Sequence, residues 1–199
     1  IVELDAETYW DACCRAVRGA LAKSGVDPAA IAALSISSQG ETFIPLDAQG
    51  QPVRRAIVWL DNRSVEEAQL VQDAFPVETI YHITGQPEVV PTWTATKILW
   101  MKRREPENFA RTAHFLLVEE YLLFRLTGHY AGEYSLQTST LLVDIQKRAW
   151  FTPMLDFVGI SRERLPELVD PGTVIAPLCP QGAADAGLCT TTLAVSGGM

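Results

Sequence analysis

The sequence predicts an α/β fold, because helical segments alternate with short β-type runs along most of its length. On one predicted helix, Trp10, Cys14 and Leu21 recur at helical spacing along a single face. By contrast, Leu34 and Ile36 alternate with serines, which is typical of a half-buried strand. The chain has 199 residues, of which 48% are hydrophobic and 20% charged. That balance suffices for one substantial core, or for one lobe of a larger protein.

The first half of the chain is predicted to hold one long helix, a hairpin and further helices. Asp5 is the expected N-cap of the first helix, and Gly25 is its expected stop. Then follow a short helix from Asp27–Pro28, a strand around Leu34 and Ile36, its hairpin partner Thr42–Leu46, a strand Val53–Trp59, and helices Ser64–Phe75 and Thr92–Arg104. Pro45 favours an edge position for the hairpin partner, and Ser64–Glu67 resembles a capping box.

The second half is predicted to alternate short strands and helices without a repeat or a long linker. The expected elements are a buried strand Phe115–Val118, a helix Glu119–Leu126 that stops at Thr127–Gly128, a turn motif with Asp144, Arg148 and Trp150, short helices Trp150–Phe157 and Ser161–Leu168, and a strand from Leu193 into Gly197, Gly198 and Met199. Within helix Thr92–Arg104, Ile98, Trp100 and Met101 are the candidate core contacts. Lys97 is expected to face solvent or to be paired.

Composition excludes several classes of function. The formal net charge is −8, and no basic stripe is present to neutralise phosphates, so we expect no nucleic-acid partner. Four cysteines and three histidines show neither disulfide nor metal-ligand spacing, which predicts reduced thiols and no metal site. No apolar run approaches the length of a membrane span, and no secretory signal is visible. We therefore expect a cytoplasmic protein without a membrane partner.

Polar side chains gather where the predicted strands of the first half end. Gln39, Gly40 and Glu41 form a polar turn, and the run Ala56–Trp59 leads into Asp61. Carboxylates accept hydrogen bonds from hydroxyls, and aromatic rings pack against the C–H faces of sugars. The pattern predicts the mouth of a site for a small polyhydroxyl ligand. Glu41 is the foremost candidate, and Trp59 and Asp61 stand behind it.

Each of these candidates also has a structural interpretation. A tryptophan at a strand end, such as Trp59, is often part of the core, and the same holds for Trp93. Asp61 could serve as the N-cap of the following helix, with Asn62 and Arg63 as partners that stabilise the fold. The sequence alone leaves these alternatives open.

Six segments resemble the FGGY carbohydrate kinases in register and in the same order. They are Ile36–Thr42, Ala56–Arg63, Trp93–Trp100, Leu122–Gly128, Val143–Trp150 and Ser196–Gly198. The resemblance covers essentially the whole chain and is closest to the xylulokinase-like branch. The Gln-x-Glu-Thr pattern at Gln39–Thr42 is also similar to glycerol kinases.

The resemblance implies an actin- and Hsp70-like (ribonuclease H-like) ATPase fold with two lobes. Residues 1–199 would form a partial N-terminal, sugar-binding domain that lacks its first β-hairpin, while the C-terminal nucleotide-binding domain would lie outside the chain. The substrate-binding residues that the resemblance implies are Gln39, Gly40, Glu41, Trp59, Asp61 and Trp93. Gly40 departs from the family pattern, because glycerol kinases have Arg at this place and xylulokinases have Met.

The resemblance places the chemistry of the reaction outside these residues. An Asp-x-Gly-Thr hairpin that contacts the phosphates would precede Ile1, and the catalytic Asp would come just beyond Met199. We therefore name no catalytic residue and no metal ligand within the chain. ATP and Mg²⁺ are the cofactors that the resemblance implies, with ligands mostly outside this chain, and the fragment alone is expected to be inactive.

The leading hypothesis is ATP-dependent phosphorylation of a ketopentose such as xylulose, with this chain as the substrate half of the cleft. Alternatives are a kinase for glycerol or another polyol, a non-catalytic sugar-binding module or pseudokinase, and a different ATPase of the same superfold. The expected partners are a small sugar or polyol and ATP. A homodimer of the full-length form remains open.

Overall fold

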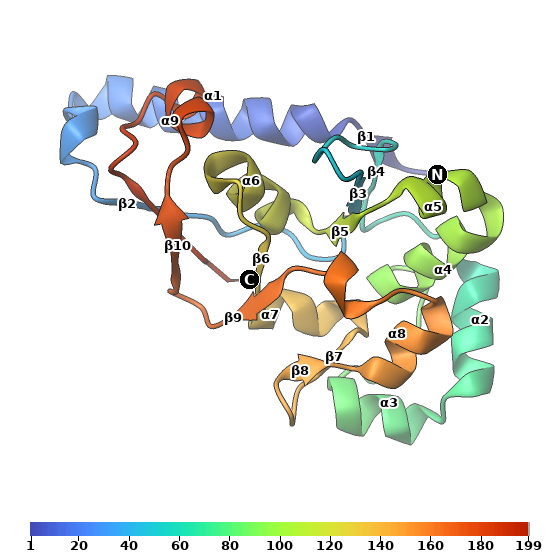
Figure 1. Cartoon of the computed structure of the whole chain (residues 1–199). Helices are drawn as coiled ribbons and strands as arrows, with labels where there is room; N and C mark the ends of the chain where they lie inside the picture. Colours follow the sequence, from blue (N-terminus) through green and yellow to red (C-terminus); the bar gives the residue numbers. More distant parts are fainter. Residues whose placement is uncertain (199) are drawn as a thin grey trace.

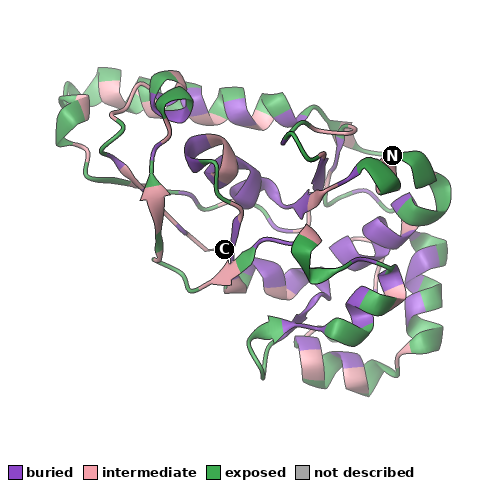
Figure 2. Ribbon diagram, in the orientation of Figure 1, coloured by how far each residue is buried: buried purple, intermediate pink, exposed green. Residues whose placement is uncertain are grey.

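In the computed structural model, which describes residues 1–198, the buried apolar side chains form two clusters. The first cluster contains Trp10, Tyr121 and Leu123, and it lies among the long N-terminal helix, a central buried helix and short strands. The second cluster contains Ile98 and Met154 and lies among the helices at the lower right of Figure 1. Figure 2 shows where buried residues lie along the ribbon. The α/β class that the sequence predicts is confirmed.

The helices are distributed over the whole length of the chain. They are α1 (Ala6–Ser24), α2 (Val65–Ala74), α3 (Val77–Thr84), α4 (Thr94–Arg104), α5 (Pro106–Arg111), α6 (Val118–Thr127), α7 (Tyr134–Gln137), α8 (Thr152–Val158) and α9 (Pro180–Ala186), with 3₁₀ turns η1 (Pro28–Ala30), η2 (Thr138–Thr140) and η3 (Arg162–Arg164). None of these helices is long and apolar enough to cross a membrane.

The strands are short and belong to several small sheets. They are β1 (Glu3–Leu4), β2 (Ala33–Ser35), β3 (Ile44–Leu46), β4 (Ala56–Ile57), β5 (His114–Leu116), β6 (Ala131–Glu133), β7 (Val143–Asp144), β8 (Ala149–Trp150), β9 (Glu167–Val169), β10 (Val174–Pro177) and β11 (Leu193–Val195). In the largest sheet β11 lies between β10 and β2, and it runs parallel to β2 with Ala33 opposite Leu193 and Ser35 opposite Val195. The other pairs are β1 with β4, β3 with β5, β6 with β9, and β7 with β8.

Several predicted elements are confirmed with small shifts of their ends. Helix α1 begins directly after Asp5 and ends at Gly25, whose φ of +67° is the left-handed conformation that glycine adopts without strain. Asp5 does not cap the helix with its side chain and pairs with Arg55 instead. Helices α4, α6 and α8 and strand β11 also lie where the sequence places them. Met199 lies outside the described residues.

The turn motif around Asp144 is confirmed as a structural hairpin. Strands β7 and β8 pair antiparallel, with Asp144 opposite Ala149. The Asp144 carboxylate accepts hydrogen bonds from the backbone N–H groups of Gln146 and Lys147, at 3.1 and 3.0 Å. These bonds organise the tight turn between the two strands.

The predicted hairpin between the Leu34–Ile36 strand and Thr42–Leu46 is wrong. Strand β2 pairs with β11, and β3 pairs antiparallel with β5, although both partners lie far away along the chain. The predicted edge position of Pro45 is confirmed, because β3 is one of only two strands in its sheet among the described residues, and the Pro45 carbonyl accepts a hydrogen bond from Val53 N–H in the following loop. Local alternation identifies a strand, but long-range packing selects its partner.

Three further expectations need correction. The predicted strand Val53–Trp59 shortens to the two residues of β4. Ser64 makes no side-chain cap, because its hydroxyl donates to Pro91 O and meets the Thr96 hydroxyl. Ser161–Leu168 forms only the 3₁₀ turn η3 before it enters β9. Helices α3, α5, α7 and α9 and strands β1, β6, β9 and β10 were not predicted.

Three carboxylates are buried where α6 meets β6 and the end of β11. Glu133 accepts hydrogen bonds from Ser135 N–H and Leu136 N–H and so caps α7. Glu119 Oε1 accepts from Gly197 N–H at 2.9 Å, and Glu120 accepts from Leu117 N–H and from the Gln137 side chain. These carboxylates therefore satisfy backbone donors that would otherwise be buried without partners.

Glu120→Gln is expected to remove a pH dependence of folding stability. Burial raises the pKa of Glu120 from 4.5 to about 8, against the opposing hydrogen bonds from Leu117 and Gln137. Between these values the folded chain keeps a proton that the unfolded chain releases, so stability falls as the pH rises. In urea unfolding, the wild-type protein should lose stability relative to Glu120→Gln between about pH 5.5 and about pH 8.5.

The matched control is Glu107→Gln, which changes an exposed carboxylate on α5. Its stability difference from the wild type should not vary with pH over the same interval. If the difference between Glu120→Gln and the wild type is equally constant, the raised pKa of Glu120 is contradicted.

Candidate functional site

The turn that contains Gly40 and Glu41 has a strained backbone. Glu41 has a φ of +56°, and the Thr42 N–H donates to Gly40 O at 2.7 Å. A three-residue turn with a positive φ at its centre is rare, and for a residue with a side chain it costs roughly 1–2 kcal/mol. Such strain persists only where the surroundings hold the chain in place, and it is common at ligand sites.

Backbone and side-chain bonds attach this turn to the segment that ends in Trp59. Phe43 and Ile57 exchange two backbone hydrogen bonds of 3.0 Å, which bring Thr42 next to Trp59. The buried Thr42 hydroxyl accepts from Trp59 N–H at 3.1 Å and from the Gln39 amide at 2.9 Å. The structure therefore brings Gln39, Glu41 and Trp59 together at one place.

A buried lysine from helix α4 provides a third connection. Lys97 is 0% exposed, and its Nζ donates to the carbonyl oxygen of Trp59 at 3.2 Å and to those of Glu41 and Val58 at 3.4 Å. Burial lowers the pKa of Lys97 to about 8, although the nearby Glu41 and Asp61 act in the opposite direction. The expectation that Lys97 faces solvent or forms a pair is wrong.

Asp61 is also fully buried, but its carboxylate is occupied. It accepts two side-chain hydrogen bonds of 2.8 Å from the Arg63 guanidinium, as well as bonds from the backbone N–H groups of Arg63 and Val2. Burial alone would raise the pKa of Asp61, but these bonds outweigh it and hold the pKa well below its usual range. Asp61 therefore carries a negative charge that Arg63 neutralises.

Arg63 extends this pair into a larger network. Its guanidinium also pairs with Glu3 at 2.7 Å and lies 4.7 Å from the ring centroid of Trp100. Arg54 pairs with Glu3 and Glu105 and contacts the same ring. Arg63 thus stabilises the fold, as one interpretation of the sequence predicts. Asp61 is not the N-cap residue of α2, because Ser64 occupies that position.

The remaining candidates differ in how accessible their polar groups are. Among the described residues no donor hydrogen-bonds the carboxylate of Glu41, which is half-buried. Trp59 is 39% exposed, so its ring is available as a surface. Trp93 lies one helical turn before Lys97, packs partly against the second core cluster, and donates its indole N–H to Glu88 O at 2.9 Å.

Because β2 and β11 pair in parallel, the C-terminal ends of these two strands lie at the same edge of the sheet. The turn with Gln39 follows β2, and Gly197 follows β11, since parallel neighbours end on the same side. The backbones come so close there that a Cβ on Gly197 would overlap the carbonyl oxygen of Ile36. Only glycine fits at this position.

The N-terminal domain of the FGGY family of carbohydrate kinases matches residues 1–199. The chain belongs to this family. The resemblance found in the six sequence segments is confirmed.

Individual relatives include kinases for different substrates. The xylulose kinase of Escherichia coli (strain K12) is 33% identical over 196 residues, which are 98% of this chain and 40% of that protein. A glycerol kinase of Thermococcus gammatolerans is 32% identical over 84% of this chain and 34% of its own length. The crystal structure of a xyloylose kinase from Brucella ovis has a TM-score of 0.90 at 30% identity and covers 98% of this chain and 40% of that one. The chain thus spans about 40% of these xylulose kinase relatives.

Within this FGGY domain, sequence reasoning missed Thr42 and misjudged Lys97. The signal for Lys97 was present, because it shares a helix face with Thr94, Ile98 and Met101, all of which are buried. A charged residue on an apolar face needs buried partners. For Thr42 no local pattern distinguishes a buried bridging hydroxyl from an ordinary strand residue.

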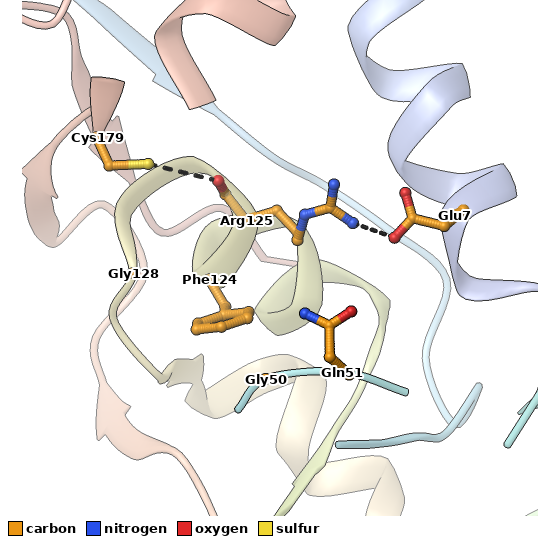
Figure 3. Close-up of a pocket in the computed structure, with 7 residues that line it drawn as sticks. All are labelled: Glu7, Gly50, Gln51, Phe124, Arg125, Gly128 and Cys179. Carbon is orange, nitrogen blue, oxygen red and sulfur yellow. Dashed lines mark hydrogen bonds and ion pairs between the residues drawn. The ribbon is translucent and has the colours of Figure 1, made fainter. Parts of the chain in front are cut away.

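Glu41 lines neither of two hollows in the described part of the chain. The first hollow has a volume of about 320 Å³ and is lined by Phe124, Arg125 and Cys179, among others. Figure 3 shows that Arg125 forms an ion pair with Glu7 there. A more apolar groove of about 460 Å³ runs along β2, α1 and α6 and ends at Gln39. No other candidate residue lines either hollow. Among residues 1–198, no group of three or more His, Cys, Asp or Glu side chains is arranged to hold a metal ion.

Asp61→Asn is expected to destabilise the fold by about 3 kcal/mol, because it removes one partner of a buried ion pair and leaves Arg63 incompletely compensated. Chemical unfolding at neutral pH measures the loss. Asp11→Asn is the matched control, since Asp11 is an exposed residue of α1, and it should change stability by less than about 0.5 kcal/mol. Equal effects of the two substitutions would contradict a structural ion pair at Asp61.

Proposed function

We propose that this chain forms the substrate half of an ATP-dependent kinase that phosphorylates a sugar or polyol hydroxyl. The proposed substrate is a ketopentose such as xylulose. One observation carries the proposal: β2 and β11 deliver the Glu41 turn and the Gly197–Gly198 pair to the same edge of one sheet. Kinases of the family use ATP, and xylulose kinases at about a third identity support the substrate class.

In this proposal Glu41 and Trp59 contact the sugar. The Glu41 carboxylate accepts hydrogen bonds from sugar hydroxyls, which are strengthened by its charge. The exposed ring of Trp59 packs against the C–H face of the sugar. Gln39, which is bonded to Thr42, borders the same turn. Asp61 orders the segment after Trp59 through Arg63, and Gly40 leaves space where a side chain would otherwise narrow the site.

We propose that the chemical step uses groups from outside the described residues 1–198. A base must take the proton of the attacking hydroxyl, and we propose that this base is an Asp that follows Gly198 in the whole protein, beside the Glu41 turn. Mg-ATP supplies the phosphoryl group when bound, and residues 1–198 hold no cluster suited to its metal. We propose that the C-terminal nucleotide-binding domain lies outside the 199 residues. We also propose that the whole protein is cytoplasmic.

The open edge of β2 supports the finer fold assignment. Among the described residues β2 pairs only with β11, and the apolar groove of about 460 Å³ borders β2 and α1. We propose that a β-hairpin preceding Ile1 in the whole protein adds to this edge, as expected for an actin-like lobe. Its phosphate-binding turn would then face the same edge of the sheet as Gly197.

A glycerol or polyol kinase is the second candidate, favoured by the Gln39-x-Glu41-Thr42 pattern and by glycerol kinase relatives. Coupled ADP-release assays of the whole protein with xylulose, ribulose and glycerol separate the two candidates. We expect the highest kcat/KM with a ketopentose. Binding of a sugar without turnover would favour a non-catalytic sugar-binding module, and a lack of both would refute the sugar site.

Glu41→Gln in the whole protein is expected to raise KM for the preferred sugar about tenfold, since it removes the charge from a hydrogen bond worth roughly 1.5–3 kcal/mol. Steady-state kinetics measure the change. Glu107→Gln alters an exposed carboxylate on α5 and should leave KM unchanged. An unchanged KM in Glu41→Gln would remove Glu41 from the site.

The isolated chain of residues 1–199 is expected to show no ATP-dependent phosphorylation, because the proposed base and phosphate-binding groups lie outside it. Incubation with xylulose and radiolabelled ATP measures this directly, with the whole protein as the positive control. Turnover by the isolated chain would contradict the proposed division of labour.

A further inference from the structure

Lys97 is an unusual buried cation. Its ammonium is 0% exposed, and among the described residues it forms no ion pair within 4.0 Å. The partners that it does have are three backbone carbonyls, those of Glu41, Val58 and Trp59. Burying a charge without a direct counter-charge is costly, so an apolar residue would suit this helix face better on grounds of stability alone.

The three carbonyls belong to the two segments that carry the proposed sugar contacts. One comes from the strained turn with Glu41 at its centre, and the others come from the segment that ends in Trp59. The Thr42 hydroxyl links the same two segments, but it binds Trp59 N–H rather than any group of Glu41. Among the described residues, it is the Lys97 side chain that hydrogen-bonds the backbone of the strained residue, Glu41.

We propose that Lys97 is a positioning residue of the sugar site, whose protonated amine fixes the Glu41 carboxylate relative to the Trp59 ring without touching the substrate. The inference rests on the proposed function for its kinetic consequence, but its structural part stands alone. The ammonium can satisfy three acceptors at once and so balances the strain of the Glu41 turn. Loss of the proton removes one donor and the charge that holds the carbonyl dipoles.

The charged groups that act on Lys97 come from the two chain segments packed against α4 at this point. Glu41 lies in the turn before β3, and Asp61 and Arg63 lie in the turn after β4. Asp61 and Arg63 compensate each other, and neither changes charge between neutral pH and about pH 9. With its pKa lowered to about 8, Lys97 loses its proton within this range.

Amide hydrogen exchange on the chain of residues 1–199 tests the structural part. The reporters are Thr42 N–H and Trp59 N–H, which donate to Gly40 O and to the Thr42 hydroxyl. In Lys97→Met we expect both amides to exchange at least tenfold faster. Leu123 N–H in α6, which lies in the other core cluster, should change by less than twofold. Equal acceleration of all three amides would mean only general destabilisation and would overturn the proposal, as would no acceleration.

Lys102→Met is the matched control, because Lys102 is exposed on the same helix. It should leave the exchange of all three amides unchanged. If Lys97→Met does not fold, wild-type protein and Lys97→Arg serve instead. After correction for intrinsic exchange, the wild type should show extra acceleration at Thr42 and Trp59 between about pH 7 and about pH 9, whereas Lys97→Arg, which keeps its proton, should not. Identical behaviour of the two would overturn the proposal.

Kinetics of the whole protein test the consequence for substrate binding. Lys97→Met should raise KM for the sugar at least tenfold with kcat within threefold, and Lys97→Arg should keep KM within threefold of the wild type at neutral pH. The wild-type KM should rise above about pH 8, and this rise should be absent in Lys97→Arg. A loss of kcat at constant KM would overturn the proposal. If the whole protein phosphorylates no sugar or polyol, the proposed function fails, while the exchange experiment still decides the role of Lys97.

Discussion

The geometry of the Glu41 turn and the Trp59 segment depends on the hydrogen bonds that the ammonium of Lys97 donates to backbone carbonyls of both segments. The ammonium lies between the two segments, which are separated in sequence by β3 and by the loop that precedes β4. It binds backbone carbonyls rather than side chains. A cation held by carbonyls fixes main-chain positions directly, so it constrains where neighbouring side chains emerge. Helix α4 can deliver it because α4 is buried over most of its length between the second core and these two segments.

Arg164 is another cation that is held by backbone carbonyls, at a place remote from the site. Arg164 donates to the carbonyl oxygens of Phe109 and Thr112 at 2.6 and 2.7 Å and lies 4.6 Å from the ring centroids of Phe109 and Phe115. Burial lowers the pKa of Arg164. There the cation packs α5 against β5 and η3, which is structural. Carbonyl partners alone therefore do not mark a functional residue. Lys97 differs from Arg164 because one of its carbonyl partners belongs to Glu41, whose backbone is strained.

Two levels of organisation connect the site to the FGGY fold. Parallel pairing of β2 and β11 sets the edge where the Glu41 turn and Gly197 meet, and the close approach of Gly197 to Ile36 requires a glycine there. The buried carboxylate of Glu119 then receives Gly197 N–H and holds the strand end. Helix α4, which packs with α2 and α8 in the second cluster, carries Lys97 and Trp100. Lys97 contacts the turn and the Trp59 segment, and the ring of Trp100 contacts Arg63. The turn and the Trp59 segment therefore lie where the two cores meet.

The sequence by itself determined the α/β class, the long helix α1, helices α4, α6 and α8, the family, and the polar turn at Gln39–Glu41. These follow from periodicity, terminal residues and motif order, all of which are local properties of the chain. Only the tertiary structure decided that β2 pairs with β11, that Asp61 forms a buried ion pair with Arg63, and that Lys97 is buried against three backbone carbonyls. Strand partners and the compensation of buried charges depend on residues distant in sequence, whose approach no local pattern encodes.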